Sequence, residues 1–177
     1  EKEALLAKSP YLKLRDDLFG RYVRDPEAQP REGDVAVDAS WAIVQSQSDD
    51  PVAVKGGVML ARFMQEVMGL EIPVVASIPA DATYGGLIQL DTRGGGQNGV
   101  PESFTVTVAP KRIGVAGIDT PGLRDGVVRL IDLFGFRMAP FLALQEIVYT
   151  PRIAMRRSAS VPGQDMTVLL GSNAIGV

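Results

Sequence analysis

Alternation of apolar and polar residues predicts a β-hairpin in the middle of the chain. Residues 103–108 (SFTVTV) place phenylalanine and valine on one face and serine or threonine on the other. This period of two is typical of a strand that is buried on one side. The alternation resumes at Ile113 and Val115, after a short link that contains Pro110. Because proline has no amide hydrogen to donate to a sheet, we place it in the turn between two antiparallel strands.

Two longer stretches share one helical plan: a polar cap, a proline, about four turns with a continuous apolar face, and a glycine. Aspartate or threonine can accept hydrogen bonds from the first free amides of a helix, and proline suits the first helical position. Glycine is the usual residue after the last turn. The cap, first residue and stop are Asp50, Pro51 and Gly69 in one helix, and Asp119 or Thr120, Pro121 and Gly135 in the other.

Short β-branched runs around these helices predict further strands. They fall within residues 35–44, 72–76 and 87–90. Strands that are joined by a helix need a crossover connection, whereas the hairpin is antiparallel. The fold class that we predict is therefore α/β (α+β), a two-layer sandwich in which a mixed β-sheet carries both main helices on one face.

The two ends of the chain differ from this central region. Residues 1–33 are charged and broken by proline and glycine, but Tyr11, Leu14, Leu18 and Tyr22 recur at helical spacing. Because short amphipathic helices usually dock on their own domain, we expect this stripe to clamp onto the main body; a partner-binding helix is the alternative. The predicted domains are an N-terminal helix and linker (1–33), an α/β domain (34–150), and a tail or the start of a following domain (151–177).

Composition excludes several function classes. The chain has 177 residues, a net charge of -3 and a pI near 5.0, so bulk electrostatics does not favour nucleic acid. No apolar run approaches the ~20 residues that span a bilayer. With no cysteine and no histidine, the chain lacks thiol nucleophiles, imidazole bases and the usual zinc ligands, and we expect no metal and no cofactor. The GGGQNG stretch lacks the lysine of a phosphate-binding loop.

Four passages follow one another along roughly residues 33–157: VMGLEIPVV at the end of the first helix, PESFTVTVAPKRIGVAGID in the hairpin, GLRDGVVRLIDLF in the second helix, and TPRIAMRR. In this order they resemble the N-terminal, non-catalytic domain of family 20 glycoside hydrolases, the β-N-acetylhexosaminidases. Similar accessory domains also precede the catalytic barrels of α-glucuronidases and other hexosaminidase families.

The resemblance implies a supporting role in a larger enzyme. The partner would be a catalytic (β/α)8 barrel of the same polypeptide, and carbohydrate would be bound by the parent enzyme, a hydrolase of N-acetylhexosamine-containing glycans. In the family, the catalytic Asp-Glu pair lies in the barrel, downstream of the region that this chain resembles. We therefore expect the chain itself not to be catalytic and to stop at the start of the barrel. A secreted or periplasmic location is also implied by the resemblance.

Arg156 is the one candidate substrate-binding residue. In the family, a Pro-Arg-Phe-x-x-Arg-Gly passage supplies an arginine that hydrogen-bonds sugar hydroxyls, and Arg156 matches it, although Arg157 replaces the glycine. A planar guanidinium suits vicinal hydroxyls. An arginine pair beside a domain junction is, however, more often an interdomain ion-pair partner or a solvated edge, and these alternatives stay open.

A stand-alone carbohydrate-binding or protein-interaction module is the alternative function. Its sugar-stacking groups would be Trp41, Tyr84 and Tyr149, but Trp41 sits between strand residues and is expected in the core. If the chain is instead an accessory domain, an apolar patch near residues 138–149 should be exposed, through which the isolated chain can form a homodimer.

Overall fold

The computed structural model describes residues 18–45, 50–79, 81–92 and 99–152. Within these ranges the chain forms two long helices and eight strands. The helices are α3 (Pro51–Glu66) and α4 (Thr120–Arg137), and the strands are β1 (Val35–Ala36), β2 (Ala42–Gln45), β3 (Val74–Val75), β4 (Leu87–Asp91), β5 (Phe104–Ala109), β6 (Arg112–Gly117), β7 (Phe141–Leu142) and β8 (Gln145–Tyr149).

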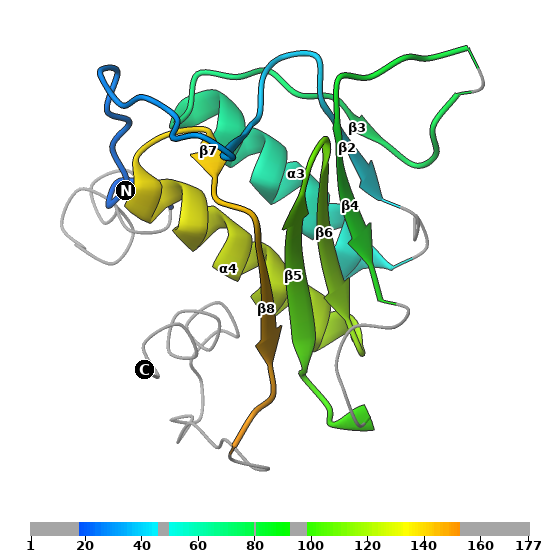
Figure 1. Ribbon diagram of the computed structural model, residues 1–177. Coiled ribbons are helices and arrows are strands. Elements are labelled where there is room, and N and C mark those ends of the chain that lie inside the picture. Colours follow the sequence, from blue (N-terminus) through cyan, green and yellow to red (C-terminus); the bar gives the residue numbers. More distant parts are fainter. Residues whose placement is uncertain (1–17, 46–49, 80, 93–98, 153–177) are drawn as a thin grey trace, which may run out of the picture.

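Six strands form one mixed sheet in the order β3-β2-β4-β6-β5-β8, and β1 pairs with β7 in a small second sheet. Strands β3, β2, β4 and β6 run parallel, whereas β5 is antiparallel to both β6 and β8. Helices α3 and α4 lie side by side on one face of the large sheet (Figure 1). The predicted two-layer α/β sandwich is confirmed, and the hairpin has the expected Pro110-Lys111 link.

Both predicted caps are confirmed, although α4 begins at Thr120, one residue before the predicted Pro121. The Asp50 carboxylate accepts a hydrogen bond from the Val52 amide at 2.8 Å, and the Asp119 carboxylate accepts one from the Gly122 amide at 2.8 Å. The Thr120 hydroxyl also donates to the Asp50 carboxylate. The two helices therefore begin beside each other, with the cap of one bonded to the first residue of the other.

The predicted stop at Gly135 is wrong. Helix α4 continues through this residue to Arg137, and Met138 takes the left-handed conformation (φ 56°) that glycine was expected to supply. Gly135 is needed for another reason: a Cβ atom there would lie 2.1 Å from the Tyr22 ring. The first helix ends at Glu66, and Gly69 follows with φ 68°.

Two other glycines let α4 lie directly on the hairpin. A Cβ atom at Gly126 would lie 2.7 Å from Val115 Cγ1, and one at Gly122 would lie 2.3 Å from the Ser103 carbonyl oxygen. Such distances leave no space for a side chain. Because residues four apart share a helix face, these glycines form one smooth strip where α4 meets β5 and β6.

The core lies between the helices and the sheet. Trp41 is only 4% exposed, which confirms its expected place in the core. Large side chains that are fully buried include Ile43, Leu60, Phe63, Met64, Ile88, Ile113, Leu123, Leu130 and Phe134.

Neither helix of the described ranges is long and apolar enough to cross a membrane.

The predicted domain boundaries, at residues 1–33, 34–150 and 151–177, stay predictions. Most of the GGGQNG stretch lies outside the described residues.

Alanine at two helical glycines should change stability in opposite directions. Gly126→Ala should lower the free energy of unfolding by about 1–3 kcal/mol, because its methyl group overlaps Val115. Gly56→Ala should raise it by roughly 0.5–1 kcal/mol, because a Cβ there meets only Val127 Cγ2 at 3.5 Å and alanine favours the helix. Urea unfolding of both variants measures this, and equal effects would contradict the close α4–hairpin contact.

Candidate functional site

The predicted substrate-binding residue, Arg156, lies outside the described residues. Its role stays a prediction. Arg152, the last described residue of the TPRIAMRR passage, is exposed after the end of β8.

Several carboxylates of the described residues have structural partners. Asp50 and Asp119 cap the two helices. Asp34 accepts a hydrogen bond from Arg137 Nη2 at 2.6 Å. Asp132, on α4, accepts hydrogen bonds from Arg21 Nη2 at 2.8 Å and from the Tyr22 hydroxyl. No group of three or more acidic, histidine or cysteine residues within the described ranges is arranged to hold a metal ion.

The segment of residues 18–25, here called the strap, lies against the C-terminal part of both helices. The Phe19 and Tyr22 rings meet the Phe63 ring edge-on at centroid distances of 5.3 and 5.6 Å. Tyr22 also covers Gly135, and Arg24 donates to a main-chain carbonyl beyond the end of α3. Both rings are only 7% exposed, so this end of the helix layer is closed by the strap.

Tyr22 thus confirms the expected clamp of the N-terminal stripe onto the main body. Leu18 does not, because it is 51% exposed. Tyr11 and Leu14 lie outside the described residues. The sequence pattern missed Phe19, which the structure buries beside Tyr22.

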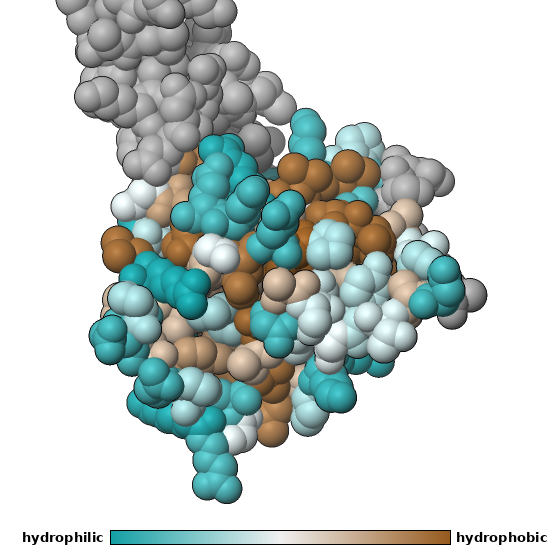
Figure 2. Space-filling view, turned by 90° about the horizontal axis from the view of Figure 1, so that it is seen from above, coloured by the Kyte–Doolittle hydropathy of each residue, from teal (hydrophilic) through white to brown (hydrophobic). Residues whose placement is uncertain are grey.

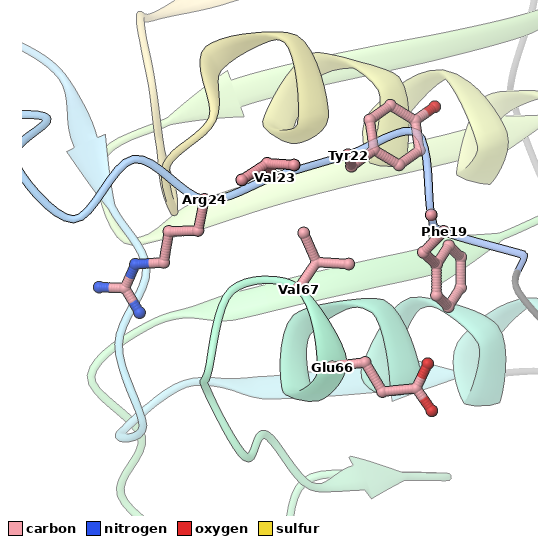
Figure 3. A pocket seen from close by; sticks show the side chains of 7 residues that line it. Phe19, Tyr22, Val23, Arg24, Glu66 and Val67 are labelled. Carbon is pink, nitrogen blue, oxygen red and sulfur yellow. The ribbon is translucent and has the colours of Figure 1, made fainter.

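A shallow hollow of about 310 Å³ lies between the strap and the end of α3. Val67 points into it from α3's end, whereas Glu66 and Arg24 extend in opposite directions at its rim (Figure 3). A sugar site needs several polar groups that converge on the ligand. The lining of this hollow is about as polar as it is apolar, and its two charged side chains diverge, so it lacks the converging groups of a sugar site. Its lining residues are Phe19, Gly20, Tyr22, Val23, Arg24, Glu66 and Val67.

The phenol of Tyr22 is held in its neutral form. Burial, the hydrogen bond to Asp132 and the negative charge of that carboxylate together raise the pKa of Tyr22 to about 12, against the opposing effect of Arg21. The Arg21 guanidinium also lies over the Tyr22 ring, 4.6 Å from its centre. Tyr22 therefore donates a hydrogen bond to the Asp132 carboxylate, which ties the strap to α4.

The three candidate stacking residues do not form one platform. Trp41 is buried, Tyr84 is half-buried before β4, and Tyr149 ends β8 and stacks on Phe104 at 5.0 Å. In the sheet, β8 lies three strands from β4, which is about 14 Å. The structure therefore does not favour the stacking surface that a carbohydrate-binding module would need.

Comparison with solved structures finds the same fold inside glycoside hydrolases. The chain is similar to the GH20 β-N-acetylhexosaminidase from Streptomyces coelicolor A3(2), with a TM-score of 0.55 and 20% identity over 75% of this chain and 26% of that chain. It is also similar to Streptomyces plicatus β-hexosaminidase, with a TM-score of 0.52, 21% identity and the same coverage.

A hydrolase of another family contains the fold as well. The GH115 4-O-methyl-α-glucuronidase BtGH115A matches with a TM-score of 0.52 and 18% identity over 68% of this chain and 19% of that chain. No family model matches the sequence, and no curated protein shows significant similarity to it.

The resemblance to part of the GH20 enzymes is thus confirmed at the level of the fold. The chain spans about a quarter of the length of the hexosaminidases that it matches.

Replacing Tyr22 with phenylalanine should make the free energy of unfolding less sensitive to alkaline pH. A pKa of about 12 in the folded state, against about 10 when unfolded, means that folding favours neutral Tyr22. The contribution of Tyr22 to the free energy of unfolding is therefore fully present below pH 10 and is lost as the pH rises towards 12. Urea unfolding between pH 8 and 11.5 should show wild type losing more stability than Tyr22→Phe.

At pH 8 the same substitution should lower the free energy of unfolding by about 0.5–1.5 kcal/mol, because the hydrogen bonds of the phenol are lost. Parallel stability curves for the two proteins would contradict the raised pKa.

Proposed function

We propose that this chain is a non-catalytic accessory domain of a larger glycoside hydrolase that acts on N-acetylhexosamine-containing glycans, and that it supports the catalytic barrel of the same polypeptide. The observation that carries the proposal is the fold match to about a quarter of a β-N-acetylhexosaminidase chain. The four sequence passages that resemble the same domain type support it independently.

The fold recurs in glycoside hydrolases of different families, which favours an accessory role for this domain over a catalytic one. It occurs in a β-N-acetylhexosaminidase and in a 4-O-methyl-α-glucuronidase, two enzymes that act on different sugars. A domain that enzymes of different specificity share is poorly suited to determine the sugar that each one cleaves.

The polar side chains of the domain support the same conclusion. Glycoside hydrolysis generally needs carboxylates that face a scissile bond from a binding cleft. Here Asp50 and Asp119 are bonded to helix amides, and Asp34 and Asp132 to arginines. These carboxylates stabilise the domain, and the proposed chemistry belongs to another part of the enzyme.

The length of the natural reading frame and its activity test the proposal. The natural polypeptide should continue beyond Val177 and release nitrophenol from a nitrophenyl N-acetylglucosaminide, whereas the 177-residue chain alone should not. A frame that closes at Val177, or a 177-residue chain that turns over the substrate, would overturn the proposal.

Arg156→Ala tests the implied substrate contact in the natural polypeptide. If the guanidinium binds sugar hydroxyls, kcat/KM should fall by about 10–100-fold, the effect of losing a charged hydrogen bond of roughly 1.5–3 kcal/mol. Arg157→Ala is the matched control, since it removes the neighbouring charge. Equal, small effects in both variants would assign Arg156 to the domain junction or to solvent.

A further inference from the structure

We draw no further inference here: the strongest candidate, the exposed apolar side chains at the C-terminal end of α4, on a surface where apolar side chains emerge between hydrophilic ones (Figure 2), carries nothing, because nothing in the described part of the structure shows that they form one patch or what covers them.

Discussion

The close approach of α4 to the β5–β6 hairpin is the contact on which the rest of this structure depends. Gly122 and Gly126 remove the side chains that would hold the helix away, so the larger residues beside them reach fully into the core. Asp119 then fixes where the helix begins, and its carboxylate also accepts from the Glu102 amide at 3.0 Å, next to β5. The GLRDGVVRLIDLF passage that carried the family resemblance is thus a packing motif. It explains a shared fold without implying shared chemistry.

Local chemistry was sufficient to predict the elements whose signals are local. The aspartate caps of both helices, each with a proline in the first two helical positions, and the alternating hairpin depend on neighbours within a few residues, and the structure has them. Gly135 was misread because its function is tertiary: it accommodates Tyr22, a residue more than a hundred positions away. Nothing near Gly135 in the sequence indicates that contact. The same reason hid the bonds of Asp132 to the strap, and an exposed methionine cap at position 138 has no sequence signal at all.

The candidate site was less predictable than the fold. Arg156 was chosen by resemblance and lies outside the described residues, whereas the residues that gather in the structure, Phe19, Tyr22 and Asp132, carry no catalytic pattern. The polar groups among them bond to each other, since the Tyr22 phenol donates a hydrogen bond to the Asp132 carboxylate. A site that binds a polar substrate must keep such groups available to the ligand. In this domain the described polar groups around the strap instead hold the strap in place against α4.

This geometry gives the end of α4 its rigidity. Tyr22 bonds to Asp132 one turn before Phe136, while Arg137 bonds to Asp34 one residue after it. The exposed ring is therefore held from both sides by contacts that are already complete within the domain.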